Sequence, residues 1–264
     1  MRTLFKGGTV ITGRGPKRAD VLVEGEKVRQ VGRLILTPAD RTVDVEGCLL
    51  FPGFIDAHTH FDLDVCNTTT ADDFTTGSRA ALKGGTTTVI DFACPNKGES
   101  LQYGLDLWHQ KADGRTFCDY GFHMTIKDWD PRIRSELRDM AAAGVTSYKV
   151  YLAYDNLRLS DAAAYQVIQA VGREGGVLGC HCENGDLVNA GIRAQKAAGR
   201  LGPSAHPRSR PPAVEAEAVN RWLAIAECAG YPVNVVHLST RRGLEHALAA
   251  RERGQKVYLE TCPQ

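Results

Sequence analysis

Two patterns of hydrophobic and polar positions divide the chain near residue 52. Residues 1–52 hold short apolar runs rich in β-branched side chains, with glycine and proline between them and no stretch of helical periodicity. This pattern is typical of short antiparallel strands joined by turns. We therefore predict a small N-terminal β-subdomain of the β-sandwich type over residues 1–52.

From residue 53 onward, short apolar runs alternate with amphipathic stretches such as 131–140 and 214–223. Repeated strand–helix units of this kind predict a parallel sheet in an α/β fold. The expected strands are 54–58, 86–92, 119–125, 146–152, 176–181, 233–237 and 256–260.

These seven strands are one fewer than the eight of a (β/α)₈ barrel. We predict a TIM-like barrel over residues 53–264 that is incomplete after its seventh strand. An open doubly wound sheet is the alternative, but no glycine-rich dinucleotide fingerprint follows the first expected strand.

Charge and composition exclude several classes of protein. The 32 Lys and Arg residues balance 31 Asp and Glu residues, which gives a net charge of +1 and no basic footprint for nucleic acid. No window is apolar enough to span a membrane, and no apolar core of a signal peptide follows Met1. We expect a soluble, cytoplasmic protein that binds neither nucleic acid nor membrane.

The eight cysteines are scattered along the chain without a Cys-x-x-Cys pair. In a cytoplasmic protein they are expected to be reduced, and we predict that most are buried. Cys180 and Cys182 flank His181, but neighbours along a strand point to the opposite face. We expect both thiols to pack away from whatever His181 faces.

Histidines end three of the expected strands. His58 and His60 are two residues apart, so in an extended segment both imidazoles point to one side and can bind one metal ion. His181 and His237 end two later strands. Each alone is more typical of a polar strand end, but the carboxyl ends of barrel strands share one rim. Four histidines at that rim favour a metal site.

Lys149 ends a fourth expected strand, between Tyr148 and Val150. A protonated amine cannot bind a metal, since it has three donors and no lone pair. A partly buried lysine can lose its proton and add carbon dioxide, and the resulting carbamate has two oxygens that suit a bridge between two cations. A buried or ion-paired lysine is the alternative, which spacing alone does not exclude.

The chain resembles the dihydropyrimidinase/D-hydantoinase family of cyclic amidohydrolases over essentially all of its length. The order and spacing of the matching stretches make coincidence improbable. They are GFIDAHTH at 53–60, TADDF at 70–74 with GGTT at 84–87, YK at 148–149, HCENG at 181–185, SRPP at 209–212 and VHLS at 236–239.

The resemblance implies a site with two divalent metal ions, usually zinc. His58 and His60 would bind one ion, His181 and His237 the other, and carboxylated Lys149 would bridge them. Tyr154 matches the family tyrosine that stabilises the developing oxyanion. Family members also carry a metal-binding, proton-shuttling aspartate at the end of an eighth strand, which lies outside this chain. We therefore expect the 264-residue chain by itself to be inactive.

The implied reaction is metal-assisted hydrolysis of the cyclic amide of dihydropyrimidines or 5-substituted hydantoins, in a homotetramer. By similarity Leu63, Val65 and Leu157 line the pocket for the ring substituent, although ordinary loop packing explains them equally well. Dihydroorotases have the pattern His-x-His-x-Arg, in which the arginine binds the carboxylate of the substrate. This chain has Asp62 at the arginine position, which favours a neutral ring over a carboxylate substrate. An allantoinase-like enzyme and a non-catalytic scaffold protein stay open as alternatives.

Overall fold

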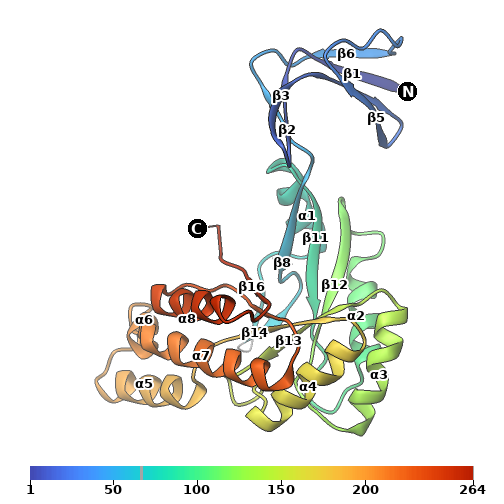
Figure 1. The fold of residues 1–264 in the computed structure, drawn as a ribbon. Helices are drawn as coiled ribbons and strands as arrows, with labels where there is room; N and C mark the ends of the chain where they lie inside the picture. Colours follow the sequence, from blue (N-terminus) through green and yellow to red (C-terminus); the bar gives the residue numbers. More distant parts are fainter. Residues whose placement is uncertain (66–67, 264) are drawn as a thin grey trace.

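The computed structural model describes residues 1–65 and 68–263, and its largest element is a sheet of seven parallel strands (Figure 1). The strands follow one another across the sheet in chain order, as in a barrel wall. All seven predicted barrel strands are confirmed. They are β8 (Phe54–Thr59), β11 (Thr86–Ala93), β12 (Asp119–Thr125), β13 (Ser147–Tyr151), β14 (Val177–His181), β15 (Val233–Val235) and β16 (Val257–Leu259).

Helices connect these strands and lie around them in Figure 1. Their starts follow local chemistry: Asp130 caps α3 with its carboxylate on the Ile133 N–H, and proline occupies the first helical position. The helices are α1 (Phe74–Lys83), α2 (Leu101–Ala112), α3 (Pro131–Ala142), α4 (Asp161–Arg173), α5 (Gly185–Ala197), α6 (Ala205–Ser209), α7 (Pro212–Ala229) and α8 (Arg241–Glu252).

The core of this region lies between the helices and the sheet. Met124, Val150 and Leu178 from the strands are fully buried with Ile168 of α4 and Trp222 of α7. Apolar burial on this scale is the main stabilising contribution to the fold, at about 25 cal/mol per Å² of apolar surface. The core therefore holds the strand ends, and whatever they carry, in fixed positions.

The first 50 residues form two smaller sheets, drawn apart from the helices in Figure 1. One has the order β5-β4-β1-β6 and the other β3-β2-β7. The strands are β1 (Arg2–Lys6), β2 (Thr9–Thr12), β3 (Gly15–Arg18), β4 (Asp20–Glu24), β5 (Lys27–Gly32), β6 (Arg41–Asp44) and β7 (Leu49–Leu50).

The prediction of purely antiparallel strands is wrong in two places in these sheets. β1 pairs with β6, and β2 with β7, in parallel, because the chain crosses over before it returns to each sheet. Leu4, Leu22 and Ile35 form a small core of their own, which supports a separate subdomain. The division of the chain at residues 52 and 53 stays a prediction.

Seven cysteines are described, and all of them are free; Cys66 lies outside the described residues. Cys180 and Cys182 are buried in the main core, as predicted. The expectation that most thiols are buried is wrong for Cys48, Cys228 and Cys262, which are exposed. Within 1–65 and 68–263, no helix is both long and apolar enough to cross a membrane.

Candidate metal and catalytic site

The five predicted metal ligands come from four strands of the large sheet. His58 lies in β8, and His60 directly follows that strand. His181 is the last residue of β14, whereas His237 comes two residues after the end of β15. Lys149 is the middle residue of β13, so the prediction that it ends its strand is wrong by two residues.

The four imidazoles lie side by side. Ring centroids are 5.1 Å apart for His58 and His60, 5.5 Å for His58 and His237, and 4.8 Å for His181 and His237. β8 is one edge of the sheet and β15 is next to the other edge. The contact between His58 and His237 therefore shows that the sheet curls until its two ends approach each other, as in a barrel.

Lys149 is buried among these residues, with only 1% of its surface exposed. Its Nζ lies 5.1 Å from the ring centroid of Phe92 and 5.4 Å from that of Tyr151. Burial lowers the pKa of the Lys149 amine to about 8. A neutral amine, the form that reacts with carbon dioxide, is thus accessible near neutral pH.

Three of the neighbouring histidines, His60, His181 and His237, have lowered pKa values and are neutral at pH 7. Burial, His58 and Lys149 together lower the pKa of His60 to about 3. Burial, Lys149 and His181 lower the pKa of His237 to about 2, and burial also lowers the pKa of His181. The Lys149 amine lies near these imidazoles, because the two rings that it contacts, Phe92 and Tyr151, in turn contact His60 and His181. A neutral imidazole keeps the lone pair that a metal requires.

Carboxylates hold two of the imidazoles in defined orientations. Glu183 Oε2 lies 2.7 Å from His181 Nε2, and Glu260 Oε1 contacts His58 Nδ1. This leaves His181 Nδ1 to face the cluster, 3.1 Å from His237 Nε2. Two nitrogens bound to one zinc at about 2.0–2.1 Å lie roughly 3.3 Å apart at a tetrahedral angle. The His181–His237 pair therefore fits one cation.

The donor set as a whole suits metal binding, although the present arrangement is not that of a formed centre. His60 Nδ1 is buried and has no hydrogen-bond partner among the described residues. In that same part of the chain, no three His, Cys, Asp or Glu side chains surround one point as metal ligands. The unmodified Lys149 has no oxygen to offer, which accounts for part of the difference.

Tyr154 joins the cluster from the loop after β13. Its ring centroid is 5.1 Å from that of His181, and its hydroxyl accepts a hydrogen bond from Arg210 Nη1 at 3.2 Å. Tyr154 has a φ of 65°, in the left-handed region that few non-glycine residues adopt. Asp62 and His237 also have positive φ. Such strain concentrates at functional sites, where the surrounding structure enforces it.

The three residues predicted to line a substituent pocket are placed differently from one another. Leu63 packs against the main core, and Val65 is 42% exposed in the short strand β9 (Asp64–Val65), which pairs with β10 (Thr68–Thr69). Leu157 donates its N–H to the carbonyl of Tyr154 at 2.8 Å. Leu157 thus belongs to the tyrosine loop, and the pocket role of all three stays a prediction.

Asp62, which occupies the arginine position of the His-x-His-x-Arg pattern, has a local structural role. Its carbonyl accepts a hydrogen bond from Lys111 Nζ at 2.6 Å, and its carboxylate lies 3.8 Å from Arg115. The side chain also accepts a weak hydrogen bond from the N–H of Phe74, at the start of α1. These contacts direct the carboxylate toward α1 and its neighbours.

Sequence reasoning missed a buried carboxylate, Asp91 of β11. It accepts hydrogen bonds from Thr59 Oγ1, the Phe61 N–H and Trp108 Nε1 at 2.8 to 2.9 Å. Burial raises its pKa to about 6 despite these donors. The contacts fix the backbone on either side of His60. A lone carboxylate inside the apolar run 86–92 was the available signal.

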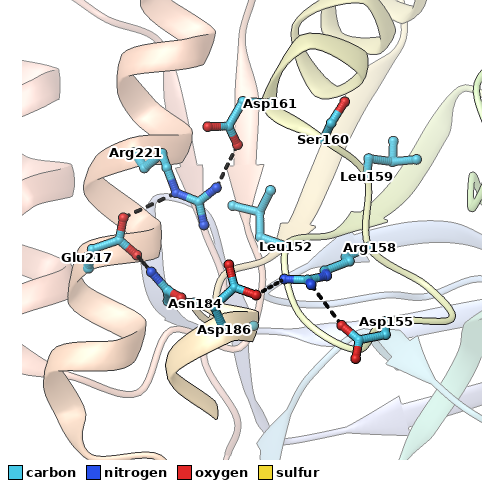
Figure 2. A pocket seen from close by; sticks show the side chains of 11 residues that line it. Leu152, Asp155, Arg158, Leu159, Ser160, Asp161, Asn184, Asp186, Glu217 and Arg221 are labelled. Carbon is cyan, nitrogen blue, oxygen red and sulfur yellow. Dashed lines mark hydrogen bonds and ion pairs between the residues drawn. The ribbon is translucent and has the colours of Figure 1, made fainter. Parts of the chain in front are cut away.

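A cavity of about 600 Å³ lies outside the histidine cluster. Figure 2 shows that its charged side chains are paired: Arg158 binds Asp155 and Asp186, and Arg221 binds Asp161 and Glu217. None of the predicted ligands lines it. The predicted metal ligands therefore lie outside this cavity.

Comparison with known proteins first gives the class. The sequence profile described as "Amidohydrolase family" matches residues 49–127, a segment that contains β8, His58, His60 and Asp91.

More detailed matches cover the whole chain. It is 38% identical to a D-hydantoinase of Geobacillus stearothermophilus over 100% of this chain and 56% of that protein. It is also 38% identical to the dihydropyrimidinase of Rattus norvegicus, over 98% of this chain and 51% of the other. The crystal structure of dihydropyrimidinase from Brevibacillus agri NCHU1002 superimposes with a TM-score of 0.97 at 38% identity, over 100% of this chain and 58% of that one.

The resemblance to the dihydropyrimidinase and D-hydantoinase family is thereby confirmed, in sequence and in fold. The chain spans a little over half the length of the curated relatives that it matches.

Proposed function

We propose that this chain carries most of the active site of a metal-dependent hydrolase that opens the cyclic amide of dihydropyrimidines or 5-substituted hydantoins. The observation that supports this most strongly is the meeting of four imidazoles at the ends of parallel strands, beside the buried Lys149 of β13. The proposal concerns a polypeptide that spans the whole length of the relatives named for this activity, called the full-length polypeptide below, because the chain covers 56% and 51% of two of them.

Each ligand has a proposed place. His58 and His60 would hold one divalent cation, His181 and His237 a second, and carboxylated Lys149 would bridge them. Carboxylation joins the neutral Nζ to the carbon of carbon dioxide and releases one proton, which leaves an anionic carbamate. Zinc is the cation we propose, because imidazole nitrogen with carboxylate-type oxygen is a donor set that zinc accepts.

When bound, two such cations supply a hydroxide near neutral pH and polarise the amide carbonyl. The residues of the chain do the rest. Glu260 and Glu183 keep His58 and His181 turned toward the centre. Tyr154 donates a hydrogen bond to the oxygen that gains negative charge when the amide carbon becomes tetrahedral. Leu63, Val65 and Leu157 are proposed to contact the ring substituent.

Two further features belong to the proposal. We propose that residues 1–52 form a subdomain separate from the barrel region at 53–264, on the basis of their own sheets and small core. We also propose a homotetramer, which rests on the family resemblance, and a cytoplasmic location, which rests on the apolar pattern of the sequence. The chain retains all five ligand-type residues. This argues against a non-catalytic scaffold protein, because such a protein does not need metal ligands.

Metal analysis and a ring-opening assay of the natural full-length polypeptide test this function together. We expect two divalent cations per chain and hydrolysis of dihydrouracil or a 5-substituted hydantoin. Lys149→Ala should lose both, whereas Lys196→Ala, at an exposed position on α5, should lose neither. Fewer than one cation per chain in the unmodified protein, or full turnover in Lys149→Ala, would contradict the proposal.

A further inference from the structure

Arg210 contacts two residues of the candidate site at once. Its Nη1 lies 3.2 Å from the hydroxyl of Tyr154 and 3.1 Å from Glu183 Oε2. Only 13% of the Arg210 side chain is exposed, and its Cζ lies 5.9 Å from the centroid of the Tyr154 ring. The guanidinium is therefore held between the tyrosine and the carboxylate that orients His181.

The backbone of Arg210 is tightly held. Its neighbour Ser209 is buried, and a side chain added at Gly191 of α5 would lie 2.2 Å from the Ser209 carbonyl oxygen. Only glycine allows α5 to approach the segment this closely. Pro211 and Pro212 follow and restrict the backbone before α7 begins. This rigid support gives the guanidinium a fixed position rather than that of a mobile surface arginine.

The loop that carries Tyr154 is also held, from the other side. The Tyr154 carbonyl accepts hydrogen bonds from the N–H groups of Leu157 and Arg158 at 2.8 Å each. The Arg158 side chain then binds Asp186 at the start of α5 (Figure 2). These contacts fix the backbone of the loop but not the direction of the Tyr154 phenol. Arg210 contacts the oxygen of that phenol.

We propose that Arg210 is a positioning residue for Tyr154. Because the guanidinium donates to the phenol oxygen, the phenol proton must point in another direction, and a donor on the oxygen also strengthens the phenol as a donor. Arg210 thus sets both the direction and the strength of the hydrogen bond to the oxyanion. This inference rests on the proposed function for its catalytic consequence, but the contact itself can be measured without turnover.

The kinetic test is a double-mutant cycle in the metal-loaded full-length polypeptide. We expect Arg210→Gln to lower kcat by about 10- to 100-fold with KM and metal content little changed, because misplacement of a donor weakens the transition state. In a Tyr154→Phe background, Arg210→Gln should lower kcat by less than threefold. Arg210→Lys keeps the charge but lacks the planar fork, so it should restore kcat only in part.

Additive losses in the cycle, or loss of metal in Arg210→Gln, would overturn the proposal and assign the effect to Glu183 and His181 instead. Arg221→Gln is the matched control, since Arg221 is an ion-paired arginine of α7 outside the site. It should leave kcat unchanged.

A second measurement is independent of turnover. With ¹³C-labelled tyrosine, the Tyr154 ring resonance is assigned by its loss in Tyr154→Phe. Arg210→Gln should shift and broaden this resonance, and Arg221→Gln should not. An unchanged resonance would overturn the positioning role. If the unmodified protein opens no cyclic amide while Arg210→Gln still shifts the resonance, the proposed function fails and the positioning contact stands.

Discussion

The histidine cluster and the outer cavity both contain many polar side chains, but they differ in how those side chains are solvated. In the cavity, Arg158 and Arg221 form ion pairs with acidic partners whose side chains are 41% to 82% exposed. In the cluster, Lys149 is fully buried, and the pKa values of His60 and His237 fall far below the usual value. The cavity therefore holds solvent-exposed ion pairs, whereas the cluster holds buried ionisable groups.

This difference shows that burial of ionisable groups identifies the candidate site better than open volume does. A surface ion pair contributes about 0–1 kcal/mol, because water screens it. Burial shifts the pKa of an ionisable group, and groups with shifted pKa values are concentrated at active sites. Changes in the cluster should therefore have large effects on function, and changes in the cavity small ones.

The largest effect is expected for His237→Ala in the natural full-length polypeptide. Removing one of two imidazoles that lie 3.1 Å apart leaves one proposed cation without a ligand pair. Turnover should fall by at least about 10³-fold, equivalent to several kcal/mol of transition-state stabilisation. Metal content should fall from two cations toward one. His109→Ala, an exposed histidine on α2, is the control, and equal losses in both variants would contradict the assignment.

A smaller effect is expected for Glu260→Gln. The amide keeps the shape of the carboxylate but lacks the charge that orients and polarises His58. Metal affinity should weaken by about 10- to 100-fold, as for other residues behind a metal ligand. A competition titration with a zinc chelator measures this. Unchanged affinity would show that the contact between the two side chains is incidental.

The pH dependence of stability distinguishes buried from exposed histidines. His60 and His237 have folded pKa values below the unfolded value near 6.5, so below that pH the unfolded state binds more protons and stability is lost. Asp91 acts in the opposite sense, because its pKa is raised to about 6 and its protonation favours the folded state as pH falls.

For the metal-free protein, we expect a net loss of about 2–3 kcal/mol in the free energy of unfolding between pH 7.5 and pH 5. The two histidines together account for about 4 kcal/mol of loss and Asp91 offsets about 1 kcal/mol. Urea unfolding at the two pH values measures it. His60→Gln should reduce the pH dependence, and His109→Gln should not. Stability that rises on acidification would contradict the neutral, buried state of these imidazoles.

The smallest effect is expected in the cavity. Glu217→Gln removes one ion pair of Arg221, whose other partner Asp161 remains. We expect stability to change by less than about 1 kcal/mol and ring opening to change by less than twofold. Thermal unfolding and the ring-opening assay measure these. A loss comparable to that of Glu260→Gln would show that the cavity belongs to the site.

The sequence was sufficient to predict the seven barrel strands and the residues that the structure brings together at their ends. The reason is that local signals carried the information: His58 and His60 are two residues apart, and the other candidates lie at or near the ends of apolar runs. Lys149 was misplaced by two residues, since strand ends are poorly marked by hydrophobicity.

The supporting residues were not predictable in this way. Glu260 contacts His58 across 202 residues, and Arg210 contacts Tyr154 across 56. The local sequence around Glu260 or Arg210 does not specify these partners. The contacts depend on how the sheet curls and how the loops fold over it. The parallel pairs β1–β6 and β2–β7 have the same origin in long-range chain return.

A crystal structure of the zinc-loaded full-length polypeptide, grown with bicarbonate and with anomalous data at the zinc edge, would locate the cations and the Lys149 side chain together. We expect two anomalous peaks, one beside His58 and His60 and one beside His181 and His237, with a carbamate on Lys149 between them. An unmodified Lys149 amine, or a single peak with one histidine pair unliganded, would contradict it.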